Sequence, residues 1–300
     1  MKFKDIVRGI IIIMLCAGCQ GKSAQSLPPL KIGYMICNSL QESKARFEPL
    51  TAYLSERLDR PCISLYINTA DFEDIVKKKG VDFAHSNSIL YIIFKKEYGA
   101  TLIAGELRGR YGSMDAGTII VRRQSKIKAM SDLRGKSMVF GPALAPMGYL
   151  SQYDLMLKSG IDPELDLSYY AIPWGAFKHE KVIYGVLYGA FDAGAAPRLD
   201  LDHMIEEGKI REDDFRILGE NEPIAYCTMS VLSHVDTAIA RKVKDIMLAI
   251  TKDDTVLLDG EVVKILRRFW IDGFVEVKDS DYDPIRTMLK NCNMYPYEEY

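Results

Sequence analysis

Strand and helix patterns alternate along most of this chain, and the alternation constrains its fold more than any other feature. Residues 30–36 alternate apolar and polar side chains as a strand does, and residues 46–58 repeat apolar side chains at helical spacing. Further strand patterns lie at 63–67 and 81–84, and each precedes a helix pattern. Strands that are separated by helices pair in parallel and need both faces of their sheet covered. The first hundred residues therefore predict an α/β unit.

The same alternation starts a second time further along the chain. Its strand patterns cover 118–122, 137–140, 168–172 and 191–195. Another apolar strand pattern follows at 224–232, and helix patterns at 236–250 and 258–269 come last. These patterns predict two α/β lobes that are joined by crossing strands near 118–123 and 224–231. Such a pair places a cleft at the carboxyl edges of both sheets, where helix N-termini favour an anionic or polar small molecule.

The N-terminus has the pattern of an export signal. Basic residues precede a short apolar run from Gly9 to Gly18, which is about half as long as a membrane-spanning helix. Ala17, Gly18 and Cys19 resemble a bacterial lipobox, in which the thiol of Cys19 is lipidated after cleavage. We therefore expect a lipoprotein signal peptide at 1–18, a polar tether at 19–29 and a lipid anchor at the cell envelope. A plain signal peptide with incidental cysteines is the alternative.

Composition and motifs exclude several classes of function. The formal net charge is −2, from 39 Lys and Arg against 41 Asp and Glu, which argues against a nucleic-acid partner. The chain has no GxSxG, HExxH, Walker A or GxGxxG pattern, and its four histidines lie at no metal-ligand spacing. We expect no enzyme, no metal and no cofactor. Four cysteines follow Cys19, and their spacing leaves the choice between disulfides and free thiols open; they are Cys37, Cys62, Cys227 and Cys292.

An ordered series of short sequence runs extends from about residue 30 to 250. It comprises 46–50 (RFEPL), 81–84 (VDFA), 119–122 (IIVR), 131–136 (SDLRGK), 138–141 (MVFG), 148–149 (GY), 192–194 (DAG) and 205–210 (IEEGKI). Together these runs resemble the phosphate, phosphite and phosphonate solute-binding proteins of ABC importers. The resemblance implies the type II periplasmic-binding fold, in which two lobes close on a ligand by a hinge. It places a discontinuous lobe 1 at 30–123 and 223–300, and lobe 2 at 124–222.

The resemblance also implies ligand residues, but several positions depart from the family pattern. Ala145, Pro146 and Met147 replace a run of hydroxyl residues that would donate hydrogen bonds to phosphonate oxygens. The backbone N–H groups of Met147, Gly148 and Tyr149 remain available to an anion at the start of a helix. Other family positions align with Phe72, Asp115, His179 and Arg198. Phe72 lacks the family's tyrosine hydroxyl, and Asp115 would repel a phosphonate. Arg198 stands near the position of a family acid that binds an amino group.

Further candidates come from the residues themselves. Trp174 and Phe177 precede a helix and can line the cleft or simply anchor that helix. Ser86, Asn87 and Ser88 are expected to cap a helix, and in this fold the same cap faces the ligand. If Asp115 and Arg198 both face the cleft with Tyr149 and Trp174, a zwitterionic or cation-bearing ligand would fit.

The sequence thus predicts an exported, lipid-anchored solute-binding protein, monomeric, that delivers a small polar or anionic ligand to the permease and ATPase of an ABC importer. The departures in the cleft predict a specificity other than that for phosphonates. A sensory subunit that presents its closed form to a membrane kinase or chemoreceptor is the alternative, because both roles use the same closed state.

Overall fold

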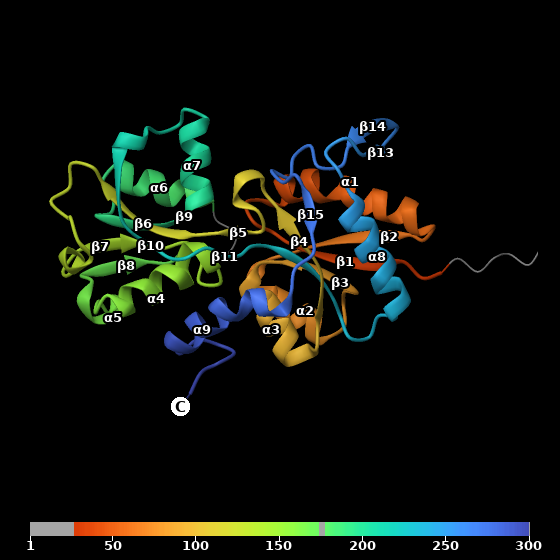
Figure 1. Ribbon diagram of the computed structural model, residues 1–300, viewed down its shortest axis with the longest axis horizontal. Coiled ribbons are helices and arrows are strands. Elements are labelled where there is room, and N and C mark those ends of the chain that lie inside the picture. The colour runs from red at the N-terminus through yellow and green to blue at the C-terminus, as the bar shows by residue number, and fades with distance from the viewer. Residues whose placement is uncertain (1–26, 174–177, 300) are drawn as a thin grey trace, which may run out of the picture.

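The computed structural model describes residues 27–173 and 178–299, which form two lobes that lie side by side (Figure 1). The predicted signal peptide at 1–18, most of the tether including Cys19, and the aromatic residues Trp174 and Phe177 lie outside the described residues. Within the described ranges, no helix combines the length and the apolar character that a membrane crossing requires. The first strand begins at Leu30, where the alternating pattern predicted it.

The first lobe is built on a mixed six-stranded sheet with the order β15-β4-β12-β3-β1-β2. Its strands are β1 (Leu30–Met35), β2 (Cys62–Ile67), β3 (Phe83–Ser86), β4 (Thr101–Leu107), β12 (Thr228–Val231) and β15 (Gly273–Val275). Strand β1 pairs in parallel with β2 and β3, whereas β12 runs antiparallel between β3 and β4. The parallel pairing of the first three strands confirms what the alternation predicted.

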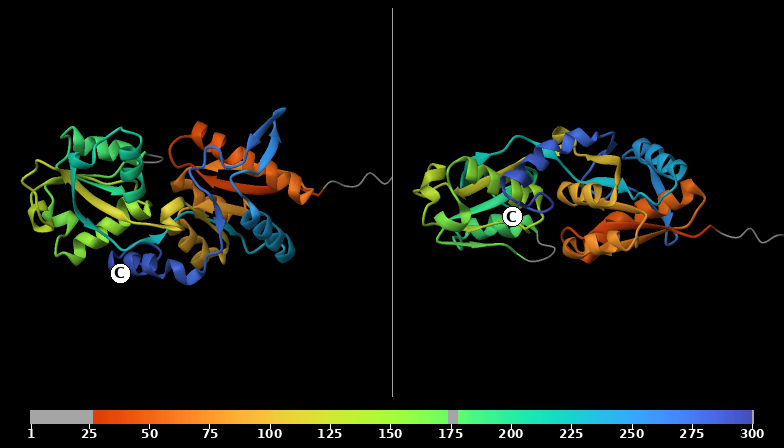
Figure 2. Two further views of the ribbon diagram at one scale, coloured as in Figure 1. Left: turned by 45° about the horizontal axis from the view of Figure 1, so that its top comes forward. Right: turned by 90° about the horizontal axis from the view of Figure 1, so that it is seen from below.

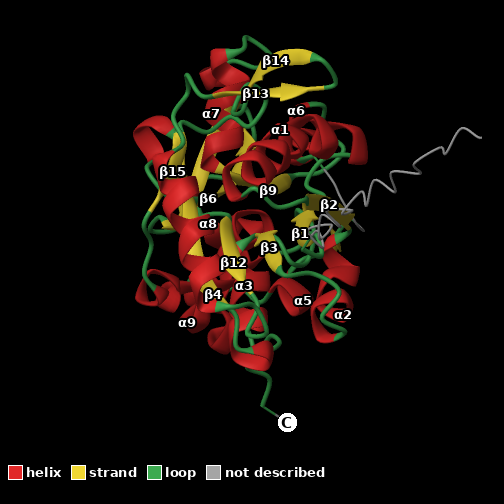
Figure 3. Cartoon of the chain, turned by 90° about the vertical axis from the view of Figure 1, so that its right-hand side faces the viewer, coloured by secondary structure: helices red, strands yellow, loops and turns green. Residues whose placement is uncertain are grey.

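Helices cover both faces of this sheet (Figure 3). Helices α1 (Leu40–Leu58) and α8 (Thr237–Ala249) pack on one face, and α2 (Phe72–Lys77) and α3 (Ser88–Tyr98) pack on the other. Helix α1 begins after Ser39, whose hydroxyl accepts a hydrogen bond from the N–H of Glu42. Helix α3 begins after Asn87, whose side chain accepts from the N–H of Leu90. The predicted cap at 86–88 is therefore present, and it is formed by Asn87.

The second lobe is a five-stranded mixed sheet with the order β10-β6-β9-β7-β8. Its strands are β6 (Gly117–Arg122), β7 (Ser137–Val139), β8 (Tyr169–Ala171), β9 (Ala193–Pro197) and β10 (Phe215–Glu220). Helices α4 (Ser151–Lys158) and α5 (Pro163–Asp166) pack on one side, and α6 (His179–Leu187) and α7 (Arg198–Glu206) pack on the other. One turn of π-helix, Pro146–Leu150, precedes α4. Two lobes of mixed sheets flanked by helices are the predicted fold class.

The chain crosses between the lobes through two segments that pair as short antiparallel strands, β5 (Met114–Asp115) and β11 (Ile224–Ala225). The sequence places the first crossing at 118–123 and ends the first part of lobe 1 at residue 123. In the structure, β6 instead lies between β10 and β9 in the second sheet, so the crossing precedes residue 117. An apolar strand pattern shows that a strand is buried but does not show which of two sheets it joins.

The helix expected at 258–269 from the apolar spacing does not form: residues 255–264 form a hairpin, and residues 265–269 are turns. Strands β13 (Thr255–Leu258) and β14 (Glu261–Lys264) are joined by Asp259 and Gly260, which both have positive φ values of 51° and 83°. A two-residue turn with positive φ at both positions matches the twist of the strands beside it, and Asp-Gly is a preferred sequence for it. The turn residues therefore override the apolar spacing here.

The last helix, α9 (Asp283–Asn291), lies across both lobes (Figure 2). Just before it, the ring of Tyr282 packs 4.6 Å from the ring of Tyr91 in α3 of the first lobe. At its other end, Asn291 donates a 2.8 Å hydrogen bond to Asp154 in α4 of the second lobe. The C-terminal segment is thus shared by the lobes, whereas the sequence assigned 223–300 to lobe 1 alone.

Phe72 belongs to the core of the first lobe and not to a ligand pocket, contrary to the prediction from the family pattern. Its side chain is fully buried and meets the ring of Phe94 edge-on at 5.2 Å between centroids. A Cβ atom added to Gly33 in β1 would lie 2.9 Å from the Phe72 ring, so the ring fills the space that this glycine leaves. The ring points into the layer between β1 and α3.

We therefore expect Phe72→Ala to lower the free energy of unfolding by about 3–5 kcal/mol, because it leaves a cavity among close-packed side chains. The more conservative Phe72→Leu should cost about 1.5 kcal/mol or less. Urea denaturation followed by circular dichroism measures both values. A Phe72→Ala chain as stable as the wild type would contradict the core role and restore the interpretation as a binding residue.

Candidate functional site

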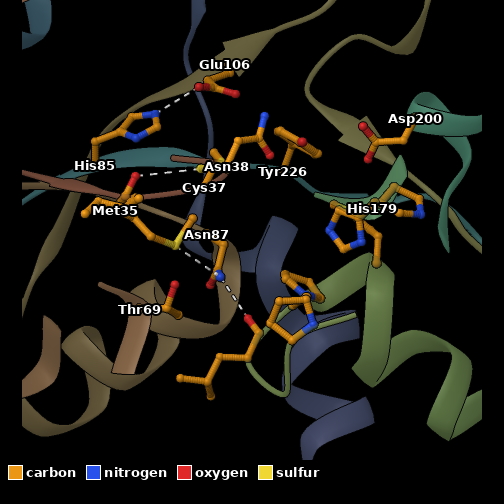
Figure 4. Close-up of a pocket in the computed structure, with 18 of the residues that line it drawn as sticks. Met35, Cys37, Asn38, Thr69, His85, Asn87, Glu106, His179, Asp200 and Tyr226 are labelled. Atoms are coloured by element: carbon orange, nitrogen blue, oxygen red, sulfur yellow. Dashed lines mark hydrogen bonds and ion pairs between the residues drawn. The ribbon is translucent and has the colours of Figure 1, made fainter. Parts of the chain in front are cut away.

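A cleft lies between the two lobes and is lined by both (Figure 4). Its first-lobe wall comes from α1 and from the ends of β1, β3 and β4. Its second-lobe wall comes from the loop after β7, the π-helical turn and the starts of α6 and α7. Strands β1 and β3 direct their carboxyl ends at this space, which is where open α/β sheets bind ligands. The cleft is therefore the candidate functional site.

A buried charged cluster forms the back of the first-lobe wall. The carboxylate of Glu106 lies 2.9 Å from Nε2 of His85, and its other oxygen accepts hydrogen bonds of 2.6 and 3.2 Å from Arg108. Burial would raise the pKa of Glu106, but Arg108 and His85 outweigh it and lower the pKa to about 2. The guanidinium of Arg108 also stacks on the ring of Tyr226 at 3.8 Å. The charges of Glu106 and Arg108 therefore neutralise each other.

Among the described residues that line the cleft, Arg46 in α1 is the cation that lacks a counter-charge. Its side chain lines the cleft and is only 9% exposed, and its Nε atom is buried without a hydrogen-bond partner. Within residues 27–173 and 178–299, Arg46 makes no hydrogen bond and no ion pair. Its guanidinium carbon lies 5.5 Å from the centroid of the Trp270 ring and 6.0 Å from that of the Phe47 ring. Its guanidinium is thus free to bind an anion that enters the cleft.

Trp270 stands at the mouth of the cleft on a strained backbone. Its φ is +57°, a conformation that bulky residues rarely adopt, and its side chain is 52% exposed. The ring covers Arg46 and also packs 5.0 Å from the ring of His203 in α7 of the second lobe. Backbone strain of this kind occurs at ligand clamps when the surrounding structure enforces it. Trp270 therefore links the anion-binding side chain to the opposite lobe.

The second-lobe wall is mainly apolar. Pro142, Leu144, Ala145, Pro146 and Met147 line it, so the side chains that replace the hydroxyl run of the family do face the cleft. The carbonyl of Leu144 accepts a 2.8 Å hydrogen bond from Nδ2 of Asn87, which joins the two walls. This wall offers a ligand apolar contact and few hydrogen-bond donors.

His179, at the start of α6, is the polar side chain that packs against this wall. Its ring lies so close to Gly141 and Gly148 that added Cβ atoms would come within 2.7 and 2.2 Å of Cε1. Burial lowers the pKa of His179, Asp200 opposes the shift, and Nδ1 is buried without a partner. A neutral imidazole therefore lines the cleft, at the position where the family pattern predicts a ligand residue.

Asp200 brings a carboxylate to the cleft from the first turn of α7. Figure 4 shows this side chain pointing from the second lobe toward the pocket, on the side where Tyr226 lies. In the part of the chain that the structure describes, its oxygens make no hydrogen bond and no ion pair. Among the described residues, the cleft thus contains one cation on the first lobe and one carboxylate on the second that have no partner.

The cysteines whose pairing the sequence leaves open are all free thiols in the structure. Cys37 and Cys227 line the cleft, and burial raises the pKa of each, so both present neutral thiols. Among the described residues, no group of three or more His, Cys, Asp or Glu side chains is arranged to hold a metal ion.

Comparison with known proteins agrees with this geometry. A family described as "ABC transporter, phosphonate, periplasmic substrate-binding protein" matches residues 32–282. This chain belongs to that family.

Two solved structures of similar fold carry related descriptions. PhnD1 from Prochlorococcus marinus in complex with methylphosphonate has a TM-score of 0.72 at 16% identity, covering 88% of this chain and 98% of that one. A binding protein component of an ABC phosphonate transporter from Pseudomonas aeruginosa has a TM-score of 0.71 at 15% identity. The match covers 89% of this chain and 87% of that one. At these identities the likeness shows the fold.

A curated relative has a different role. The chain is 24% identical over 240 residues to the tetrathionate sensor histidine kinase TtrS of Salmonella typhimurium, and 77% of the chain is aligned. The alignment spans 39% of that relative, so the chain corresponds to about two fifths of its length.

The fold brings only some of the predicted site residues to the cleft. Asn87, Met147 and His179 line it. Gly148 lies beneath the His179 ring, and Tyr149 is buried in the core of the second lobe beside Phe140. Ser86 is fully buried behind the wall with its hydroxyl unpaired. Trp174 is outside the described residues.

Asp115 and Arg198 do not line the cleft, and this corrects the predicted acid and base. Oδ1 of Asp115 accepts hydrogen bonds of 2.8 and 3.2 Å from the N–H groups of Ala116 and Leu199, so it holds the start of α7 against the crossing strand β5. Arg198 binds Asp202 at 2.9 Å and Glu220 at 3.0 Å. It lines a separate charged groove on the second lobe.

The sequence analysis missed four charged residues that do line the cleft, namely Arg46, Glu106, Arg108 and Asp200. Arg46 stands in the RFEPL run that carried the resemblance, where it served as a family marker only. Glu106 and Arg108 lie at the end of β4, a strand that the patterns did not identify, and three charged residues within 106–110 were a usable signal. Asp200 gave no signal, because one acid in the first turn of a helix is common.

The position of Asp115 predicts an unusual dependence of stability on pH. Burial raises the pKa of Asp115 to about 7, because its backbone hydrogen bonds compensate only in part. The folded protein therefore holds this proton more tightly than the unfolded chain, whose Asp pKa is about 3.9. The stability contributed by the protonated group is fully present below about pH 4 and is lost as the pH rises to about 7.

We expect Asp115→Asn to remove this loss, because the amide keeps an oxygen acceptor and carries no charge. At pH 8 the variant should be more stable than the wild type by about 2–4 kcal/mol, and the difference should vanish near pH 4. Urea unfolding between pH 4 and pH 8 measures it, with the exposed Asp213→Asn as the control. Parallel stability curves for Asp115→Asn and the wild type would refute the assignment.

Proposed function

We propose that this protein is an exported, lipid-anchored solute-binding protein that captures a small anionic ligand between its lobes and delivers it to the permease and ATPase of an ABC importer. Membership of the phosphonate substrate-binding family supports the solute-binding role. The observation that carries the proposal is Arg46, a guanidinium that is only 9% exposed, lines the cleft and lacks a counter-charge among the described residues.

The free energy of the buried guanidinium explains why an anion would bind there. Leaving a charge buried without a partner costs several kcal/mol, and a ligand anion removes that cost by supplying the opposite charge. Arg108 cannot serve in the same way, because Glu106 already neutralises it. Trp270 covers Arg46 and contacts His203 across the cleft, so an anion held by Arg46 would favour the closed arrangement of the lobes.

The same cleft supports a specificity other than that for phosphonates. Ala145, Pro146 and Met147 replace three hydroxyl side chains on the second-lobe wall, and Asp200 adds a negative charge there. Each lost neutral donor would weaken the binding of a phosphonate by about 0.5–1.5 kcal/mol. We propose that the ligand is an anion with fewer charges or fewer acceptor atoms than a phosphonate.

The anchor and the partners complete the proposal. The lipobox-like sequence before Cys19 supports attachment to a membrane through acyl chains at the outer face of the cell envelope. The protein would act as a monomer, since one chain supplies both walls of the cleft. Its partners would be the ligand, the permease and the ATPase, with no nucleic acid, no cofactor and no enzymatic step.

Ligand sensing is the second candidate function. It is favoured by the 24% identity to a tetrathionate sensor histidine kinase over 77% of this chain. In that case the closed form would signal to a membrane kinase rather than deliver its ligand, and the same cleft and closing motion would serve.

Arg46→Gln tests whether the cleft binds an anion. A panel of phosphate, methylphosphonate, thiosulfate, carboxylates and amino acids is screened by thermal shift, where ligand at 100 times its Kd stabilises by about 2.7 kcal/mol. Arg46→Gln should weaken binding of any active ligand by about 2–5 kcal/mol, without lowering the melting temperature of the free protein. Arg57→Gln, an exposed arginine on the same helix, is the control. Equal affinity in wild type and Arg46→Gln would reject this binding site.

Deletion of the gene separates import from sensing once the panel has identified a ligand. An importer component is required for uptake, so cells without it should lose high-affinity uptake of the radiolabelled ligand. A sensory subunit is required for response, so its loss should leave uptake intact and abolish ligand-induced transcription. Uptake and transcript levels are measured in the deletion strain and in the same strain that carries Arg46→Gln.

A further inference from the structure

The charges of the cleft are arranged with opposite signs on opposite lobes. Four side chains of fixed charge line it within the described ranges, and two of them, Glu106 and Arg108, form an ion pair of 2.6 Å. The other two are Arg46 on the first lobe and Asp200 on the second, and neither has an ion-pair partner in the described structure. The neutral imidazole of His179 adds no charge.

Arg46 and Asp200 face the same space without reaching each other. Both line the cleft together with Trp270, and Trp270 and Asp200 also line the adjoining depression. No ion pair within 4.0 Å joins their charged groups, although each lacks another partner in the described chain. A ligand between them can therefore contact both, one from each lobe.

We propose that the ligand is a small zwitterion whose singly charged anionic group, a carboxylate or sulfonate, binds Arg46 and whose ammonium group binds Asp200. This inference rests on the proposed function and names the class of ligand for the same cleft. A zwitterion supplies one charge of each sign and leaves both cleft charges paired. A dianion would leave one negative charge in excess and place it near Asp200, and a simple cation would face Arg46.

The aromatic rings of the cleft bear on the kind of ammonium group. Quaternary ammonium groups are recognised by aromatic faces that surround them. Here the ring of Tyr226 carries Arg108 on one face at 3.8 Å, and the ring of Trp270 lies 5.5 Å from Arg46. The carboxylate of Asp200 is instead free to accept hydrogen bonds, which a primary ammonium group donates and a quaternary one cannot.

This arrangement puts the anion on the first lobe. The second-lobe wall at Ala145, Pro146 and Met147 contributes apolar contact to the middle of the ligand. A ligand that carries its anionic group to α1 and its ammonium group to α7 would connect the lobes by two opposite attractions. Its binding would therefore stabilise the closed arrangement more than binding to one wall alone.

The test compares matched probes that differ only in charge. Isothermal titration calorimetry on the full-length chain, purified in detergent, measures β-alanine and taurine as zwitterions, propionate as anion, propylamine as cation and methylphosphonate as phosphonate. We expect a zwitterion to bind about 10- to 100-fold more tightly than propionate or propylamine, since one charged contact is lost with each of the latter. The comparison of β-alanine with taurine decides between carboxylate and sulfonate.

Two variants assign the ends of the ligand. Asp200→Asn should weaken zwitterion binding about 10- to 100-fold and leave propionate binding unchanged or stronger. Arg46→Gln should weaken both. Glu206→Gln, an exposed acid on the same helix, and Arg57→Gln should change neither.

The outcomes separate this inference from the proposed function. If Asp200→Asn binds the zwitterion as the wild type does, or if methylphosphonate binds more tightly than both zwitterions, the zwitterion proposal is overturned while an anion site at Arg46 still stands. If Arg46→Gln binds every probe as the wild type does, the anion site of the proposed function fails as well.

Discussion

The carboxylate of Glu106 determines how the rest of the cleft can work. It is almost fully buried, and it accepts from His85 on β3 and Arg108 after β4, so it ties together strands that lie on either side of β12. Glu106 neutralises the guanidinium of Arg108, which also stacks on the ring of Tyr226. This ion pair leaves no net charge at the back of the cleft for a ligand to bind. Within the described part of the chain, Arg46 is thereby left as the unpaired cation of the first-lobe wall. The buried cluster of Glu106, His85 and Arg108 therefore has a structural role, and anion binding is left to the neighbouring Arg46.

Much of the fold can be predicted from local patterns, because the buried face of a helix or strand repeats apolar residues at a fixed spacing in the sequence. The alternation at 30–98 predicted three parallel strands and their helices, and the structure has them. The apolar pattern of a strand does not show which sheet the strand joins, so β6 was assigned to the wrong lobe. At 255–264 the Asp-Gly turn decided the structure against a helical spacing, and that signal was present in the sequence.

The binding residues were harder to predict than the fold, for a physical reason. Whether a charged side chain is free depends on contacts made far along the chain. The sequence does not distinguish Arg198 from Arg46, but Arg198 forms ion pairs with Asp202 and Glu220, whereas Arg46 lies beside aromatic rings and has no ion-pair partner among the described residues. Asp115 and Asp200 differ in the same way, since Asp115 accepts two backbone hydrogen bonds where β5 crosses between the lobes. The predicted chemistry, an acid and a base across the cleft, reappears on different residues.

Helix α9 has a mechanical consequence for the motion of the lobes. The strands β5 and β11 form one attachment between the lobes, and α9, which contacts α3 on one side and α4 on the other, forms a second. Two separated attachments oppose twisting of one lobe against the other, whereas a single attachment allows both bending and twisting. Rotation about the line between the two attachments is therefore the relative motion of the lobes that disturbs the fewest of these contacts.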